Sequence, residues 1–199
     1  MARFLVTRAP GPNWDHAKTT REQAAWDPHA AFMDALADDG FVVYGGPAGN
    51  RGEAVHVVNG PDEQTIEARL ALDPWTSAGV LRTAAIESWA TWLGGDDRLD
   101  PSRPLYLVGY GPGPNWDPTK PRREQEGWDT HARFMDALDE GVVIVGGPLD
   151  ERRAMLVMRD DDEQSLRSRI DEDPWVGDVL TVERVAQWRL WLPPRPHRR

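Results

Sequence analysis

The chain has 199 residues, of which 40% are hydrophobic and 28% are charged, and its formal net charge of −10 at pH 7 argues against a general nucleic-acid binder. The absence of cysteine excludes disulfides, thiolate nucleophiles and cysteine-bound metal sites. No apolar run approaches the ~18 residues of a membrane span, and none resembles a secretory signal. We therefore expect a cytoplasmic protein with no membrane partner. The excess of arginine over lysine indicates a GC-rich bacterial source.

The chain is a tandem duplication. The motif G-P-N-W-D begins at Gly11 and again at Gly113, and D-P-W begins at Asp73 and again at Asp173. All 10 tryptophans fall into matched pairs. The period of about 100 residues indicates a duplicated domain, because it is far longer than a solenoid unit. The sequence divides into a first repeat, residues 1–93; an exposed connector, residues 94–104; and a second repeat, residues 105–199.

Each repeat is predicted to have the element order β-α-β-β-α-β. Short apolar runs bounded by Gly and Pro indicate strands over residues 3–7, 41–46, 54–58 and 80–93, and, in the second repeat, over 104–108, 142–147, 154–158 and 179–192. Apolar residues at helical spacing indicate helices over 27–39 and 62–72.

Capping signals define the predicted start of the first helix. Asp27 is expected as the N-cap with Pro28 at the first helical position, and Asp129 is expected to cap the second copy. Upstream, Thr20 and Gln23 resemble a capping box and predict a short helical turn.

This order is the ferredoxin-like split βαβ arrangement, so the predicted fold class is α+β. Each half would be an open sheet with helices on one face, and its bare face needs a cover. We expect the other half to supply that cover, which would give an intrachain pseudo-dimeric α/β barrel. The sequence leaves open whether chains associate further into a homo-oligomer.

A histidine lies on the apolar stripe of the first helix in both repeats. His29 is followed at helical spacing by Phe32, Met33 and Leu36. His131 is followed in the same way by Phe134, Met135 and Leu138. One interpretation is a core histidine whose ring is satisfied by a nearby carbonyl. The other is a general base, because the positive end of the helix dipole favours the neutral imidazole that a base requires.

Asp73 and Asp173 precede Pro-Trp at the end of the second predicted helix. A carboxylate at this position could simply form the turn. It could also orient the imidazole of His29 or His131 and stabilise its protonated form. The spacing does not decide whether the two side chains meet.

The Gly-Pro loop after the first strand carries candidate ligand-binding residues. Such loops leave strand ends, where ligands often bind. A tryptophan could stack on a planar substrate and a lysine could pair with an anionic group. The alternative is a turn stabilised by Asn and Asp, with the tryptophan covering the core. The candidates are Asn13, Trp14 and Lys18 in the first repeat, and Asn115, Trp116 and Lys120 in the second.

Other chemistries have weaker support. Asp27 with His29, and Asp15 with His16, offer metal-ligand types without a recognised spacing, so no metal site is predicted. The segment 109–113 lacks the features of a P-loop or a Rossmann fingerprint. No matched serine stands beside the histidines, so a serine-hydrolase triad has no support. We expect no cofactor.

The ordered set of motifs resembles the YCII-related family. The marks in the first repeat are His29, Gly46-Pro47, Asp73-Pro74-Trp75 and Gly79-Val80-Leu81, and in the second His131, Gly147-Pro148, Asp173-Pro174-Trp175 and Val179-Leu180. The resemblance covers nearly the whole chain and implies a ferredoxin-like fold assembled as a dimeric α/β barrel. It also implies a His–Asp active-site pair, His29 with Asp73 and His131 with Asp173.

The chain departs from the family pattern at one position. The family has an arginine three residues before the histidine, where this chain has Trp26 and Trp128. We therefore expect a more aromatic pocket, with Trp26 and Trp128 among the substrate-binding residues. One class of the family performs a dehydrochlorinase step on a chlorinated aromatic compound.

These observations predict a cofactor-independent enzyme that acts on a small planar, aromatic or anionic metabolite. His29 and His131 would transfer protons, and Asp73 and Asp173 would orient them, in an elimination or an isomerisation. The matched residues predict two similar sites. One alternative is a binding or regulatory module that holds a metabolite unchanged, and another is a structural protein whose histidines are only buried.

Overall fold

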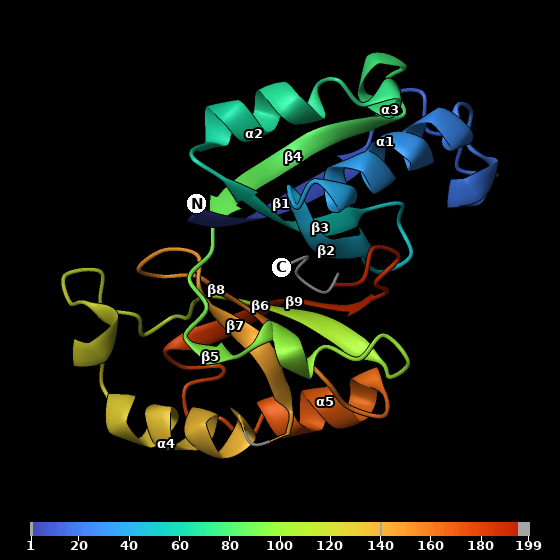
Figure 1. The fold of residues 1–199 in the computed structure, drawn as a ribbon. Coiled ribbons are helices and arrows are strands. Elements are labelled where there is room, and N and C mark those ends of the chain that lie inside the picture. The colour runs from blue at the N-terminus through green and yellow to red at the C-terminus, as the bar shows by residue number, and fades with distance from the viewer. Residues whose placement is uncertain (1, 140, 195–199) are drawn as a thin grey trace. The chain divides into compact units, whose positions relative to one another are not determined.

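A computed structural model describes residues 2–139 and 141–194, and Figure 1 shows their course. The chain forms two compact units. Unit 1 holds the chain up to Ser88 together with the segment that starts at Arg189, and unit 2 is Trp89–Trp188. Within the described residues, no helix combines the length and the apolar character needed to cross a bilayer.

Unit 1 is a four-stranded antiparallel sheet with helices packed on one face. Its strands follow the order β2-β3-β1-β4. The core of this unit packs apolar side chains of α1 and α2 against the sheet, among them Met33, Ile66, Phe4 and Val58. Its elements are β1 (Ala2–Pro10), a 3-10 turn (Thr20–Glu22), α1 (Trp26–Asp38), β2 (Val42–Pro47), β3 (Ala54–Gly60), α2 (Glu63–Leu70), α3 (Pro74–Ser77) and β4 (Leu81–Ser88).

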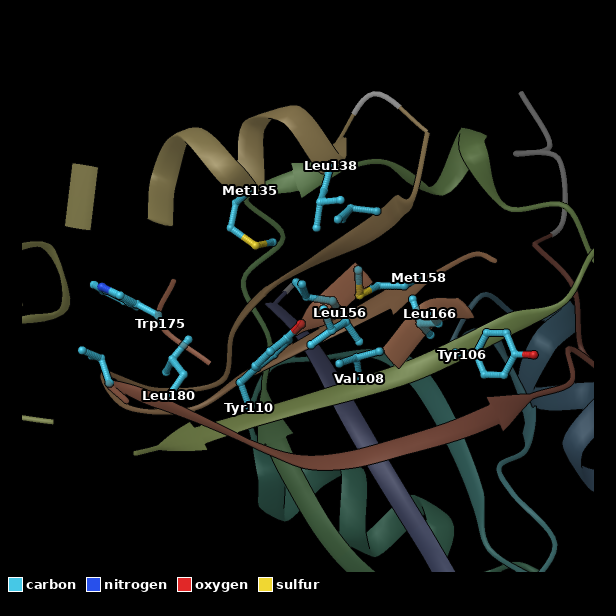
Figure 2. Close-up of a cluster of buried hydrophobic side chains, with 13 residues drawn as sticks. Tyr106, Val108, Tyr110, Met135, Leu138, Leu156, Met158, Leu166, Trp175 and Leu180 are labelled. Carbon is cyan, nitrogen blue, oxygen red and sulfur yellow. The ribbon is translucent and has the colours of Figure 1, made fainter. Parts of the chain in front are cut away.

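Unit 2 repeats this arrangement with one extra short strand, in the order β5-β7-β8-β6-β9. Figure 2 shows its core, in which Met135 and Leu138 of α4 lie over Val108 and Met158 of the sheet. Its elements are β5 (Leu93–Gly94), a 3-10 turn (Asp96–Arg98), β6 (Leu105–Pro112), a 3-10 turn (Arg122–Glu124), α4 (Trp128–Asp139), β7 (Val143–Pro148), β8 (Ala154–Met158), α5 (Glu163–Ile170) and β9 (Leu180–Trp188). The predicted α+β class with two ferredoxin-like repeats is confirmed.

The segment that follows the last strand of each repeat belongs to the other unit. In unit 1, Gly45 and Leu192 exchange backbone hydrogen bonds of 2.9 Å. In unit 2, the Trp92 amide donates to the Gly146 carbonyl at 2.8 Å. Each segment thereby covers the open edge of β2 or β7, where unpaired backbone groups would otherwise invite association. The sequence repeats and the compact units are therefore different divisions of the chain.

The predicted last strands are too long, because the end of each one pairs within the other unit. Strands were expected over 80–93 and 179–192, whereas β4 ends at Ser88 and β9 at Trp188. The apolar pattern continues past both ends because the chain enters a second site of burial. The Gly-Gly-Pro motifs make that site, since a Cβ atom at Gly46 or Gly147 would overlap the backbone of the incoming segment.

The start predicted for the first helix is also wrong, by two residues. Asp27 is not the N-cap: α1 begins at Trp26, after Ala25 in the left-handed conformation with φ 57°. Likewise α4 begins at Trp128, so Asp129 lies inside the helix. Tertiary hydrogen bonds fix the preceding turn, because the Trp75 indole donates to the Ala24 carbonyl at 2.7 Å.

The capping box lies one residue earlier than predicted. The side chain of Glu22 accepts a hydrogen bond from the Thr19 amide at 2.9 Å. Gln23 instead fastens the preceding loop, because its side chain accepts from the Asp15 amide at 3.0 Å and donates to the Asp15 carbonyl at 2.8 Å. Gln125 does the same at Asp117, which explains why this glutamine occurs in both repeats.

Candidate functional site

The structure brings His29 and Asp73 together in unit 1. Nδ1 of His29, in the first turn of α1, donates to Oδ1 of Asp73 at 2.9 Å. Asp73 is the N-cap of α3, and the same Oδ1 accepts from the Trp75 amide at 2.9 Å. The carboxylate therefore forms the turn and also orients the imidazole. Because a carboxylate only accepts, this bond fixes the proton on Nδ1 and leaves Nε2 of the neutral ring as an acceptor.

The imidazole of His29 lies flat on the indole of Trp75. The two ring centroids are 3.8 Å apart and the planes differ by 5°. Trp75 is itself fully buried and is held by its hydrogen bond to the Ala24 carbonyl. The D-P-W motif thus supplies both the partner of the histidine and the surface against which its ring rests.

A buried arginine completes the polar cluster of unit 1. Arg8, on β1, is only 1% exposed. Its Nη2 donates to Oδ2 of Asp73 at 3.2 Å and to Oγ1 of Thr76 at 2.7 Å. Burial alone would raise the pKa of Asp73, but the hydrogen bond and charge of His29, the Trp75 amide and the Arg8 charge together hold it below its usual value. Asp73 is therefore a carboxylate at neutral pH.

A second histidine, His56 on β3, lies in the same unit. Burial, reinforced by the positive charge of Arg8 and by His29, lowers the pKa of His56 to about 3. The ring is therefore neutral at physiological pH. The second repeat has no counterpart of His56, since Leu156 stands at the matched position.

These groups surround a cavity of about 260 Å³ in unit 1. His29, His56 and Arg8 lie in its wall. Its aromatic part includes Trp26 and Trp191, whose rings meet edge to face at 5.7 Å. The cavity therefore has an aromatic side and a polar side.

Unit 2 contains the same dyad. Nδ1 of His131 lies 2.9 Å from Oδ2 and 3.0 Å from Oδ1 of Asp173. The imidazole stacks on Trp175, with 4.1 Å between centroids and 3° between planes. The Trp175 indole donates to the Glu126 carbonyl at 2.7 Å. The predicted pairing of histidine with aspartate is thus observed as geometry in both units.

The surroundings of the second dyad are apolar. Tyr110 and Val176 stand where unit 1 has Arg8 and Thr76, and Leu156 replaces His56. Figure 2 shows Tyr110, Leu156 and Trp175 within one cluster of buried side chains. Burial, with the nearby Asp173 charge, raises the pKa of Tyr110, so its hydroxyl stays protonated. This cavity has a volume of about 450 Å³.

Arginines lie at the aromatic side of the second cavity. The guanidinium groups of Arg122 and Arg123 lie 5.8 and 5.7 Å from the ring centroid of Trp92. Arg122 donates to the Asp150 carbonyl at 2.6 Å. Among the described residues, the guanidinium groups of Arg123 and Arg152 have no hydrogen-bonded or ion-paired partner, and both residues line the cavity. In unit 1, Arg21 stacks similarly over Trp191 at 5.1 Å.

The predicted tryptophans of the first repeat lie at the cavity. Trp26 lines it, and Trp14 lines it while contacting the edge of Trp75 at 6.0 Å. In unit 2, Trp128 lines the cavity, whereas Trp116 packs against the core cluster.

The predicted loop amides and lysines are engaged elsewhere. Asn13 donates to the Ala78 carbonyl at 2.9 Å, and Asn115 donates to Asp178. Lys18 pairs with Asp15 at 3.4 Å and Lys120 with Asp117 at 3.7 Å. All four brace the loop, as the structural alternative for this loop predicts.

The cavity residues that the sequence analysis did not select are Arg8, His56, Tyr110, Trp92 and Trp191. One signal was available for Arg8: it directly follows the apolar run of the predicted first strand, and a charge that is buried there must find a partner. Across residues 2–139 and 141–194, no group of three or more acidic or histidine side chains is arranged to hold a metal ion.

Comparison with known proteins supports the fold. No protein-family model matches the chain, and no curated protein matches its sequence. Solved structures match over nearly the whole length. A heme-binding protein from Thermus thermophilus is 16% identical, with a TM-score of 0.56 over 95% of this chain and 91% of that one. A candidate chlorite dismutase is 10% identical, with a TM-score of 0.54 over 94% of this chain and 93% of that one.

A third structure, a candidate monooxygenase from Fusobacterium nucleatum, is 11% identical with a TM-score of 0.50, over 95% of this chain and 92% of that one. At these identities the matches show the fold alone, and the predicted α+β fold class is confirmed. The finer resemblance to the YCII-related family stays a prediction.

Proposed function

We propose that the chain is a cofactor-independent enzyme whose His–Asp dyads transfer protons on a small planar metabolite. One observation carries the proposal: in each unit a cavity-lining imidazole is held by a carboxylate at Nδ1 and by an indole on its face. A core histidine that only needs a partner would not require a cavity. A preorganised base requires all three features.

The arrangement gives each group a defined task. Nε2 of His29 or His131 accepts a proton from a carbon of the substrate, because Nδ1 already donates to Asp73 or Asp173. The carboxylate then stabilises the imidazolium. The indole face adds a favourable interaction with that cation. The electron pair left on carbon forms a double bond as a leaving group departs, or the proton returns at another atom.

The cavity walls favour planar and anionic ligands. Indole rings offer faces for stacking, and they lie in both cavities. Arg123 and Arg152 in unit 2 offer donors in the fork geometry that suits a carboxylate. The elimination or isomerisation predicted from the sequence would suit such a ligand.

The first experiment compares the metabolites that the protein consumes. The wild-type chain, His29→Gln, His131→Gln and the double variant are incubated with a bacterial metabolite extract and analysed by mass spectrometry. We expect a compound that the wild type depletes, with a new product, and that the double variant leaves intact. His16→Gln, at an exposed histidine outside both cavities, is the matched control.

Two other results would contradict the proposed enzyme activity. Depletion that persists in the double variant would remove the histidines from the reaction. A compound that the wild type retains unchanged would favour a ligand-binding or regulatory module over an enzyme.

A second candidate is axial ligation of heme, which one matched structure binds. A histidine whose Nδ1 donates to a carboxylate is also a common form of metal ligand. The cavity of about 450 Å³ in unit 2 lies within the ~300–1,000 Å³ typical of ligand and cofactor sites, whereas the 260 Å³ of unit 1 falls below it. Unit 2 therefore offers a histidine donor in the larger of the two cavities. His131 would hold the iron, Asp173 would orient the imidazole, and bound heme would supply redox chemistry.

Titration with hemin separates the two candidates. A Soret band that shifts on addition of the wild type, and not of His131→Gln, would favour heme binding. An unchanged spectrum would leave proton transfer as the function of both dyads.

A further inference from the structure

We propose that the cavity of unit 1 contains a subsite for an anionic oxygen, formed by Arg8 and His56, which unit 2 lacks. This inference rests on the proposed function in one respect, namely that the ligand occupies the cavity of the His29 dyad. It names the class of ligand: a planar molecule with a carboxylate, or with a carbonyl that becomes an enolate.

Arg8 has hydrogen-bonding capacity that the protein does not use. Its bonds to Asp73 and Thr76 both come from Nη2. Nε is buried and has no partner, and Nη1 donates to no described residue. Buried donors are almost always paired, so the unpaired Nε of an arginine that lines the cavity indicates capacity for a further acceptor.

His56 shows the same feature. The residue is 9% exposed and lines the cavity, and its ring makes no hydrogen bond with any described residue. The ring is neutral, so it offers one N–H donor and one acceptor nitrogen. Gly45, its neighbour across the β2–β3 ladder, leaves room for the ring, because a Cβ there would be 2.5 Å from Cδ2 of His56.

The strand register places the two side chains on one face of the sheet. Val6 pairs with His56 and Arg8 pairs with Ala54. Arg8 and His56 are therefore diagonal neighbours across β1 and β3, at a separation that long side chains bridge. One oxygen atom or one carboxylate could accept hydrogen bonds from both.

The Arg8 charge lies close to the dyad. Among the described residues, Arg8 forms one ion pair, with Asp73, which the His29 imidazole shares. When Nε2 of His29 removes a proton from a carbon next to a carbonyl, the electron pair moves into a new C=C bond and the carbonyl oxygen becomes an enolate. Donors from Arg8 and His56 would stabilise that oxygen where its charge develops.

Unit 2 cannot bind an anion in this way. Tyr110 and Leu156 occupy the matched positions and belong to the apolar core cluster (Figure 2). In the part of unit 2 that the structure describes, the cavity cations without a hydrogen-bonded or ion-paired partner for their guanidinium groups are Arg123, near Trp92, and Arg152. The two cavities should therefore prefer different ligands although their dyads are alike.

Ligand titration followed by NMR tests the subsite without any need for turnover. Benzoate and its neutral analogue benzamide are added to protein with ¹⁵N-labelled histidines, and the His29 and His56 resonances report binding in unit 1. We expect benzoate to shift both resonances and benzamide to bind at least ~10-fold more weakly. Equal binding of the two probes in unit 1 would overturn the proposal.

Substitution then locates the subsite. His56→Leu introduces the residue that unit 2 has at this position, and we expect it to weaken benzoate binding, read from His29, by ~10-fold or more. Leu156→Met, a volume-conserving change at the matched position, should leave that affinity unchanged. An unaltered affinity in His56→Leu would contradict the proposal. If the wild type binds benzoate but turns over no metabolite, that result would contradict the proposed function alone.

Discussion

The two units hold the same dyad in opposite environments. In unit 1, the carboxylate of Asp73 pairs with the buried Arg8. In unit 2, Tyr110 stands at the position that matches Arg8, and Val176 at the position that matches Thr76. The His–Asp distance and the stacking on tryptophan are nearly the same in both. Dyad geometry therefore depends on the shared helix turn and the D-P-W motif. The strand residues beneath it set only the charge and polarity of the cavity.

The largest expected effect comes from neutralising the two aspartates. Asp73→Asn leaves the Arg8 charge buried without its counter-ion, which should cost about 3–5 kcal/mol of unfolding free energy. Asp173→Asn removes hydrogen bonds but strands no arginine, so we expect about 1–3 kcal/mol. Urea unfolding at pH 7 measures both. Equal losses would show that Arg8 does not depend on Asp73.

The second prediction concerns how His56, which has no counterpart in unit 2, makes the free energy of unfolding depend on pH. Below the ordinary histidine pKa of about 6.5, the unfolded chain takes up a proton at His56, whereas the folded chain does so only near pH 3. Stability due to His56 is therefore complete above pH 6.5 and is lost as the pH falls, by up to about 1.4 kcal/mol per unit.

His56→Leu removes this contribution while Arg8, His29 and Asp73, the charged and titratable groups that act on His56, remain in place. The stability of the variant, measured by urea unfolding between pH 7 and 4.5, should fall less steeply than that of the wild type. Parallel pH profiles would mean that His56 takes up its proton equally in both states.

Much of the dyad could be predicted from the sequence because its parts are local. The apolar stripe of the first helix fixed the face on which His29 lies, and D-P-W is a recognisable capping turn. The duplication also supplied an internal control, since each part occurs twice. The meeting of the two parts depends on how α1 and α3 pack on the sheet, which spacing alone does not determine.

The rest of the site depends on tertiary contacts. Arg8 and His56 lie on different strands, and only the ladder register makes them neighbours. Trp191 reaches its cavity because the segment after β9 pairs with β2. Lys18 is a residue type that could bind an anionic ligand, but it forms an ion pair with Asp15, three residues earlier in the same loop. Local sequence patterns do not predict these contacts.

The smallest expected effect concerns the residue before the first helix, where the repeats differ by one methyl group. Ala25 adopts φ 57° and Gly127 adopts φ 73° at matched positions. Ala25→Gly relieves about 1–2 kcal/mol of left-handed strain and loses about 0.4–1 kcal/mol through the unfolded state, so we expect a net gain of about 0.5 kcal/mol. Gly127→Ala should reverse the sign and lose about 1 kcal/mol, because its Cβ would also approach Nε1 of Trp175 at 3.3 Å. Thermal unfolding should show shifts of opposite direction, of about 2–4 °C per kcal/mol. Shifts of the same direction would mean that the helix start, unlike the dyad it positions, is not equivalent in the two repeats.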